Sequence, residues 1–393
     1  MNNSILNTEI QEFIDDNINS DVASLLFKKK SFSNVELKEV IEQIEAKRKC
    51  KTKLPTWFKT SNIYYPNKLN IEQTSSEITA DYKSRLMNGN SIIDITGGFG
   101  VDCFFFSKYF EEVTHCEIDK NLSKIVSHNY NQLEANNTKT LNVDGIEHIQ
   151  QVEKTCDWIY IDPSRRHDSK GKVFYLKDCL PNVPEHLDLL FKYTNNVLVK
   201  ASPMLDISIG ISEIKHTKAI HIVAVNNEVK EVLFMLNKGH KDEIAIDTIN
   251  IKGEKKETFS FLYSTELNAK ANFSLPLTYL YEPNAAILKS GAFKTIAQEL
   301  NINKLHQHSH LYTSNALIDF PGRIFKIVKH IPYNKKAIKK ILGNSKVNIT
   351  TRNFSESVSE LRKKFNMKDG GESYAFFTTN ISDEKIVLVC EKL

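Results

Sequence analysis

The chain has 393 residues, 41% of them hydrophobic, which predicts a folded protein of two or three domains. Nothing approaches the run of about 18 apolar residues that a membrane span needs, and the start lacks the basic and apolar segments of a secretory signal. Six cysteines form no C-x-x-C pair, so we expect buried free thiols, a cytoplasmic location and no contact with a membrane.

Residues 1–72 are expected to form a helical N-terminal region that packs on the next domain. Leu37, Val40, Ile41 and Ile44 repeat at helical spacing, and Ser33-Asn-Val-Glu36 has the pattern of a capping box. The aromatic stretch 54–69 either covers a cleft or seals core. A second capping-box pattern at 73–77 predicts another helix. Three residues at the start of this helix are candidates for secondary ligand contacts: Gln73, Thr74 and Ser75. A helix cap with no role in ligand binding explains them nearly as well.

A glycine turn follows the first predicted strand, which begins at Ser91 and ends at Asp94. The turn, Gly97-Gly-Phe-Gly100, lets backbone approach a ligand where a Cβ would block it, and the following helix offers free amide groups. The pattern does not fit the G-x-G-x-x-G fingerprint of dinucleotide sites. With Asp94 facing an ammonium group, it suits S-adenosylmethionine, an amino acid joined to adenosine. A tight strand-to-helix joint explains the glycines equally well.

Four more strand patterns alternate with helices, at 113–117, 140–144, 156–162 and 197–200, before a strand pair at 219–236. This is the layout of a class I methyltransferase, whose ligands bind at strand carboxyl ends. Glu117, 23 residues after Asp94, is placed to hold ribose hydroxyls, unless it is a helix cap or an exposed charge. Asp144 could accept a hydrogen bond from the adenine amino group, and Asp119 reads as a helix cap.

The loop after the fourth strand is the expected place for the methyl acceptor. Asp162-Pro-Ser resembles the Asp-Pro-Pro loops of amino-group methyltransferases, with Ser164 in place of the second proline. No cysteine follows Pro163, which argues against a covalent mechanism through a cysteine at this loop. Arg165 and Arg166 clamp a phosphate or form internal salt bridges. Lys200 is either an active-site cation or a surface charge at the end of a strand.

The C-terminal part divides into a region at 241–320 with weak strand patterns and a basic tail at 321–393. We expect a turn at 281–284, a helix at 285–300, and then a small α/β domain with helices at 335–342 and 355–365 and strands at 347–351, 374–379 and 385–390. The tail has 15 Lys and Arg against 7 Asp and Glu, whereas the whole chain carries only +4. This asymmetry indicates an anionic partner, or a solvated lysine-rich surface.

The alternating histidines His306, His308 and His310 would share one face of a strand. Zinc sites recruit Cys or carboxylate partners at defined spacings, and the sequence shows none nearby, so we expect no metal. Gly370 and Gly371 either let backbone approach RNA or simply make a loop.

Asp94–Asp102, Glu117–Asp119 and Asp162–Arg166 together resemble the bacterial class I methyltransferases with a THUMP-like C-terminal domain, a likeness running from about Leu54 to the end. The resemblance implies a Rossmann-like sheet with a C-terminal β hairpin and ferredoxin-like and THUMP-like domains. We expect domains at 1–72, 73–240, 241–320 and 321–393. The expected residues are, for catalysis, Asp162, Pro163 and Ser164; for the cofactor, Asp94, Thr96, Gly97, Gly98, Gly100, Glu117 and Asp144; and for the substrate, Arg165, Arg166 and Lys200.

Three functional hypotheses follow from the sequence. The first is an S-adenosylmethionine-dependent methyltransferase acting on RNA, such as tRNA or rRNA, captured by the basic tail. The second is the same enzyme acting on protein or a small molecule. The third is a nucleic-acid-binding protein whose cofactor fold has lost catalysis, and the intact carboxylates at 94, 117, 144 and 162 argue against it.

Overall fold

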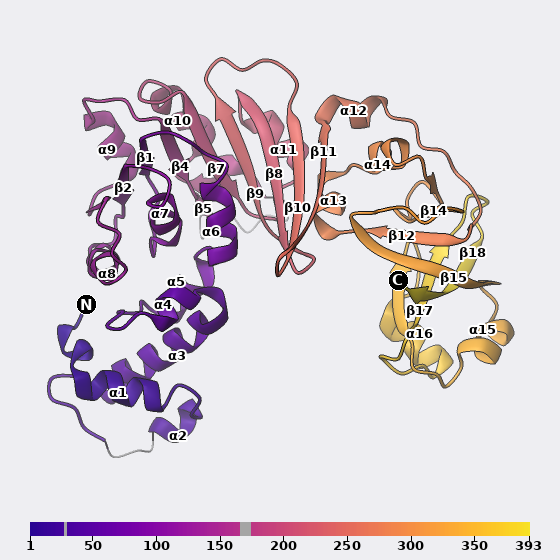
Figure 1. Cartoon of the computed structure of the whole chain (residues 1–393), viewed down its shortest axis with the longest axis horizontal. Coiled ribbons are helices and arrows are strands. Elements are labelled where there is room, and N and C mark those ends of the chain that lie inside the picture. Colours follow the sequence, from indigo (N-terminus) through magenta and orange to yellow (C-terminus); the bar gives the residue numbers. More distant parts are fainter. Residues whose placement is uncertain (27–29, 166–173) are drawn as a thin grey trace. The chain divides into compact units, whose positions relative to one another are not determined.

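The computed structural model describes residues 1–26, 30–165 and 174–393 (Figure 1). The chain forms two compact units, which are described separately. The first comprises Met1–Lys218 and Leu233–Lys241, and the second comprises Ala219–Val232 and Asp242–Leu393.

The N-terminal helices belong to the first unit: η1 (Asn3–Leu6), α1 (Thr8–Asp16), α2 (Val22–Leu26), α3 (Leu37–Lys53), α4 (Pro55–Lys59), α5 (Lys68–Gln73) and α6 (Glu77–Ser84). Trp57 of α4 is fully buried, with its ring centroid 4.9 Å from that of Phe104 and 6.2 Å from that of Phe99 in the glycine turn. The helices therefore pack on the sheet domain, as predicted, and at Trp57 the aromatic stretch 54–69 seals core.

Both predicted capping boxes are wrong. Asn34, with φ of 61°, lies in a tight turn, and α3 begins only at Leu37, without a side-chain cap. Ser76 rather than Thr74 caps α6. The Glu77 carboxylate instead accepts hydrogen bonds from the backbone and hydroxyl of Thr56 (2.6 and 2.8 Å), because α4 packs close enough to compete for it.

Five parallel strands form the centre of the first unit, in the order β3-β2-β1-β4-β7. They are β1 (Ser91–Asp94), β2 (Glu112–Cys116), β3 (Thr138–Leu141), β4 (Trp158–Ile161) and β7 (Asn196–Ala201). The helices that alternate with them are α7 (Val101–Phe106), α8 (Lys120–Gln132), α9 (Gly145–Gln151), α10 (Val183–Leu190) and α11 (Ile207–Glu213). Strand order reverses between β1 and β4, and ligands of open α/β sheets bind at such switch points.

The predicted hairpin follows as β8 (Thr217–Val225) and β9 (Glu228–Asn237), which are neighbours in the sheet. Asp119 caps α8 as expected, since its carboxylate accepts a hydrogen bond from the Leu122 amide. This is the Rossmann-like class I sheet with a C-terminal β hairpin that the sequence predicts.

The second unit continues with β10 (Ala245–Lys252), β11 (Lys255–Leu262) and α12 (Tyr263–Asn268), and it contains a seven-stranded sheet in the order β13-β14-β12-β15-β18-β17-β16. The strands of this sheet are β12 (Tyr279–Pro283), β13 (Asn303–Lys304), β14 (Tyr312–Ser314), β15 (Gly322–Pro332), β16 (Asn348–Arg352), β17 (Ser373–Thr379) and β18 (Lys385–Lys392). The helices are α13 (Ala285–Ser290), α14 (Thr295–Glu299), α15 (Lys335–Leu342) and α16 (Val358–Phe365).

Several C-terminal predictions need correction. The expected turn at 281–284 lies mostly within β12, and the expected helix at 285–300 is two helices, because the chain turns at Gly291 with φ of 77°. Strand β15 was not predicted from the sequence. Its pairing with β18 shifts register between Ile327 and Lys329, which leaves Val328 57% exposed and breaks the alternation that marks a strand.

The other tail elements agree closely with prediction, and α15 has the predicted bounds. Helix α16 starts three residues later than expected, because Ser357 and Glu360 form a capping box there. All six cysteines are buried and free, as expected. Among the described residues, no helix has the length and apolar character needed to span a bilayer.

Candidate functional site

Asp94 ends β1 and is 2% exposed. Its Oδ1 atom accepts hydrogen bonds from the backbone and hydroxyl of Thr96 (2.8 and 3.1 Å), and its Oδ2 atom accepts one from the Cys103 thiol (3.4 Å). Burial raises the pKa of Asp94 to about 7, and the negative charge of Asp102 adds to the rise. Within the described part of the chain its hydrogen-bond donors are all neutral, so a bound cation would be favoured here.

The glycine turn has two kinds of glycine. A Cβ on Gly97 would lie 2.3 Å from the His115 ring, and one on Gly100 would lie 2.3 Å from the Tyr130 hydroxyl, so both are required by the protein's own packing. Among the described residues, a Cβ on Gly98 would meet nothing closer than 3.9 Å, so they leave space open beside it. The sequence does not distinguish a glycine required by internal packing from one beside open space.

Glu117, just after β2, is tied to the glycine turn. Its carboxylate accepts hydrogen bonds from the Gly98 amide (2.9 Å) and the Asp119 amide (2.7 Å). Burial raises its pKa despite these bonds. Beside Glu117, Ile118 is 72% exposed, and Val143 after β3 is also exposed. These apolar side chains are candidate ligand contacts that were not predicted. Each stands next to a predicted acidic residue in the sequence, Glu117 or Asp144, and that neighbourhood is the signal that could have identified them.

Asp144 is the N-cap of α9, where its Oδ1 atom accepts hydrogen bonds from the amides of Ile146 and Glu147. The helix starts against the residue that follows β1, since a Cβ on Gly145 would lie 2.2 Å from the Ile95 carbonyl oxygen. Asp144 therefore lies at the same edge of the sheet as Asp94 and Glu117, with one of its oxygens used for capping.

A buried polar cluster adjoins Asp94. The Asp102 carboxylate accepts hydrogen bonds from the hydroxyls of Ser75 and Tyr160, both at 2.8 Å, and pairs with the fully buried ammonium of Lys83 at 3.1 Å. Burial alone would raise the pKa of Asp102, but the charges of Lys83 and Lys200 and these hydrogen bonds hold it below its usual value. Lys83, Asp102 and Tyr160 were not predicted as site residues. They become neighbours only when α6, α7 and β4 pack together.

Asp162 and Lys200 form an ion pair, with 2.5 Å between Oδ2 and Nζ. The Asp162 amide donates a hydrogen bond to the Thr96 hydroxyl (2.7 Å), and the Lys200 ammonium donates one to the Ser75 hydroxyl (3.1 Å). The Lys200 side chain is only 12% exposed. Lys200 therefore lies among the other candidate residues rather than at the surface, and its predicted role as an active-site cation stays a prediction.

These contacts, together with the peptide bond between Asp102 and Cys103, close into a ring of polar groups, which we call the polar ring. It consists of Asp94, Thr96, Asp162, Lys200, Ser75, Asp102 and Cys103. Ser75 takes part through its hydroxyl rather than as a helix cap. The ring joins the carboxyl ends of β1, β4 and β7 to the segment before α6.

Ser164 and Arg165 form the short strand β5, which pairs with β6 (Cys179–Leu180), and both are exposed. The guanidinium of Arg165 lies over the Phe174 ring, 5.7 Å from its centroid. Arg166 lies outside the described residues. The predicted roles of Pro163, Ser164 and both arginines stay predictions.

The three histidines do not share a strand face. His306 lies 2.9 Å from Asp383 and 3.0 Å from Asn353, whereas the His310 ring stacks on that of Phe293 with centroids 3.6 Å apart. Across the described ranges, no three His, Cys, Asp or Glu side chains come together as a metal site would require.

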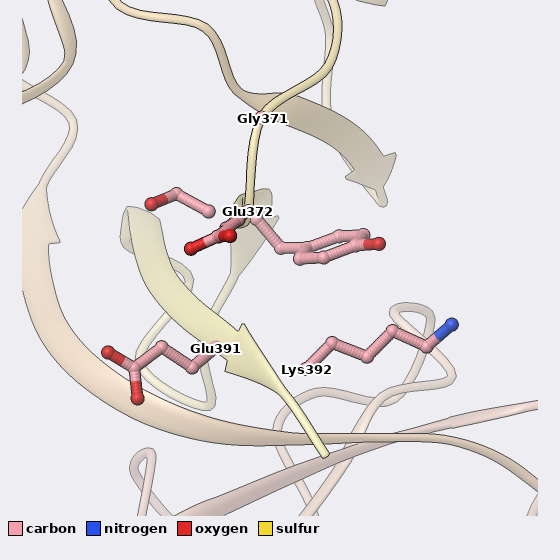
Figure 2. A pocket seen from close by; sticks show the side chains of 6 residues that line it. Gly371, Glu372, Glu391 and Lys392 are labelled. Atoms are coloured by element: carbon pink, nitrogen blue, oxygen red, sulfur yellow. The ribbon is translucent and has the colours of Figure 1, made fainter.

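A hollow on the second unit is lined by Gly371, Glu372, Ser373, Tyr374, Glu391 and Lys392 (Figure 2). Two carboxylates against one ammonium make this lining unsuited to phosphate. A Cβ on Gly371 would lie 2.8 Å from the Lys346 carbonyl oxygen, so packing against the segment before β16 accounts for that glycine.

The comparisons with known proteins agree with this fold. Residues 279–321 match the model of a ferredoxin-like domain, and residues 322–392 match the model of a THUMP domain-like family. No curated protein matches the chain. The predicted domain limits themselves stay predictions.

Among solved structures, the chain is similar to a "putative methyltransferase" from Porphyromonas gingivalis W83, with 30% identity, a TM-score of 0.89, and coverage of 98% of this chain and 97% of that one. Lesser likenesses include a "putative methyltransferase" from Streptococcus mutans in complex with SAH, with 12% identity, a TM-score of 0.31, and coverage of 41% of this chain and 96% of that one. Another is M. capricolum TrmK in complex with S-adenosyl-homocysteine, with 13% identity, a TM-score of 0.33, and coverage of 46% and 71%.

The similarity to the P. gingivalis protein runs over nearly the whole of both chains, and the THUMP-like match covers the C-terminal end. The chain belongs to the family of bacterial class I methyltransferases that carry a THUMP-like C-terminal domain.

Proposed function

We propose that the protein is an S-adenosylmethionine-dependent methyltransferase that acts on RNA captured by its basic C-terminal domain. The observation that carries the cofactor part is Asp94, a buried carboxylate with a raised pKa and neutral hydrogen-bond donors at the switch point of the sheet. When bound, the cofactor would supply the methyl group on an electrophilic sulfonium.

The residues at the sheet edge fit such a donor. Asp94 would pair with the methionine ammonium, and the open space beside Gly98 gives room for its chain. Glu117 would hold the ribose hydroxyls. The exposed apolar side chains of Ile118 and Val143 suit the two faces of an adenine ring, and Asp144 would accept from its amino group.

The reaction is a direct displacement, so this chain's part is to align the two reactants. Asp162 would accept a hydrogen bond from the acceptor amine, with Pro163 and Ser164 shaping the loop. The amide of Asp162 is held by Thr96, whose own amide and hydroxyl are bonded to Asp94. Movement of the acceptor loop relative to the donor's ammonium is thereby restricted.

The proposal for RNA rests on charge. Helix α15 exposes four lysines, Lys335, Lys336, Lys339 and Lys340, and turns Ile338 and Leu342 into the core. The sequence from Tyr333 to Ser355 has no acidic residue. On α16, by contrast, Arg362 pairs with Asp369 and Lys364 with Glu356. The face of α15 therefore offers the denser field for phosphates.

The decisive experiment is transfer of tritiated methyl groups from S-adenosylmethionine into total RNA and total protein from a deletion strain. Label in RNA supports the proposal, and label only in protein or small molecules contradicts the RNA part. Calorimetry with S-adenosylmethionine against NAD tests the cofactor separately, and preference for NAD would contradict it. Asp94→Asn should abolish label and donor binding together.

A further inference from the structure

Two lysines meet at one hydroxyl in the polar ring. The Lys83 ammonium lies 3.0 Å and the Lys200 ammonium 3.1 Å from the Ser75 hydroxyl oxygen. The side chain of Lys83 has no exposed surface, and its carboxylate partner is the buried Asp102. Lys200 pairs instead with Asp162, whose side chain is 36% exposed. Of these two cations, Lys200 is the one that a ligand can reach.

The amino-acid end of the proposed donor carries two opposite charges only a few bonds apart. Asp94 would pair with the ammonium, and the carboxylate would then need a cationic partner of its own. Three short contacts lead from Asp94 to Lys200: 3.1 Å to the Thr96 hydroxyl, 2.7 Å from there to the Asp162 amide, and 2.5 Å from the Asp162 carboxylate to Lys200. An anion and a cation thus lie on the same ring.

We infer that Lys200 binds the donor's carboxylate, and that in the ligand-free protein Asp162 competes for Lys200. This inference rests on the proposed function. When the donor binds, Lys200 exchanges one carboxylate for another, so no buried charge is left unpaired. The exchange releases an oxygen of Asp162, the residue placed to receive the acceptor amine. Donor binding would then precede acceptor binding.

The inference makes an unusual prediction for Asp162→Asn. The variant keeps the amide that donates to Thr96 but removes the competing charge, so S-adenosylhomocysteine should bind more tightly than to the wild type. A purely structural role for the Asp162–Lys200 pair predicts the opposite, because breaking a half-buried ion pair loosens the site.

Calorimetry on the full chain should use two probes: S-adenosylhomocysteine, and 5′-methylthioadenosine, which lacks the amino-acid end. Lys200→Met should weaken binding of the first by about tenfold to a hundredfold, the range for a hydrogen bond to a charged group, and leave the second unchanged. Lys200→Arg should retain most of the affinity. Lys215→Met, which changes an exposed lysine outside the ring, is the matched control.

The outcomes separate the two proposals. If the wild type binds neither probe, the proposed function fails, and the inference fails with it. If the wild type binds S-adenosylhomocysteine but Lys200→Met weakens both probes equally, or Asp162→Asn weakens the first, only the inference is overturned. Should Lys200→Met not fold, Lys200→Arg and Asp162→Asn still decide, because each retains polar groups at both positions.

Discussion

The Nε2 atom of His115 occupies the place where a side-chain carbon on Gly97 would have to go, 2.3 Å from the position of that carbon. His115 is fully buried on β2, burial lowers its pKa to about 4, and its ring also lies 3.2 Å from the Gly98 carbonyl oxygen. At neutral pH the ring is therefore uncharged, and it packs against the glycine turn.

Gly97→Ala should destabilise the protein by about 1–3 kcal/mol, because the new methyl group forces the buried ring or the turn to move. Urea unfolding of the wild type, the two single variants and the double variant Gly97→Ala/His115→Ala measures the effect. The two changes should be strongly non-additive, with the second recovering much of the loss from the first. Simple additivity would show that the ring is not the obstacle.

Asp94 should make donor binding depend on pH. Its pKa of about 7 means that, in the ligand-free protein, the carboxyl is increasingly protonated below that pH, whereas pairing with an ammonium requires the charged form. The affinity for S-adenosylhomocysteine should rise as pH increases from 6 to 8 and then level off, with protons released on binding near pH 6.5. Calorimetry in buffers of different ionisation enthalpy detects that release. A profile that is flat over this range would contradict the assignment.

The same group should affect the stability of the ligand-free protein. The pKa of Asp94 in the folded protein lies above the ordinary value of 3.8, so the folded state holds this proton more tightly than the unfolded state does. The stability gained from the protonated carboxyl is fully present below about pH 4 and is lost as the pH rises to about 7. Asp94→Asn should remove this loss, so the variant should gain stability relative to the wild type as pH is raised from 5 to 8. Thermal unfolding of both proteins across this range measures the difference.

The lysines of α15 should determine how RNA binding responds to salt. Changing Lys335, Lys336, Lys339 and Lys340 to Gln should lower affinity for total tRNA and reduce the steepness of the salt dependence, by up to about 0.7 to 0.9 for each phosphate that is no longer neutralised. Filter binding between 50 and 200 mM salt, a range chosen for its sensitivity, measures both. The control changes four exposed lysines of the first unit to Gln: Lys38, Lys51, Lys59 and Lys154. If the control variant weakens RNA binding as much as the α15 variant does, binding depends on the overall charge of the protein rather than on the surface of α15.

Glu282 joins the ferredoxin-like and THUMP-like segments. Its side chain, 4% exposed, pairs with Arg323 of β15 and with Arg352 of β16 at 3.0 Å. Glu282→Gln should cost about 2–4 kcal/mol, less than a fully buried pair because both arginines are one-third exposed. Denaturant unfolding followed by limited proteolysis should locate the loss in the second unit. Unchanged stability would mean that the arginines find other partners.

The sequence by itself determined the order of the first unit's elements and the positions of its carboxylates. Strand alternation with helices, the glycine turn and the acidic residues at strand ends are local patterns, and β1, β2, β4 and β7 lie close to where those patterns place them. Strand β12 was read partly as a turn because it ends in Glu282-Pro283, and β15 was missed because a bulge moves Val328 to the surface and interrupts its alternation.

Only the tertiary structure decided which side chains meet. Lys83, Asp102 and Tyr160 come from three separate elements, and nothing in their spacing marks them as neighbours. Packing also divided the glycines, with Gly97 and Gly100 set against the protein's own side chains and Gly98 left beside open space. Local patterns record the period of an element and its ends, but the partners of a buried charge depend on how those elements pack.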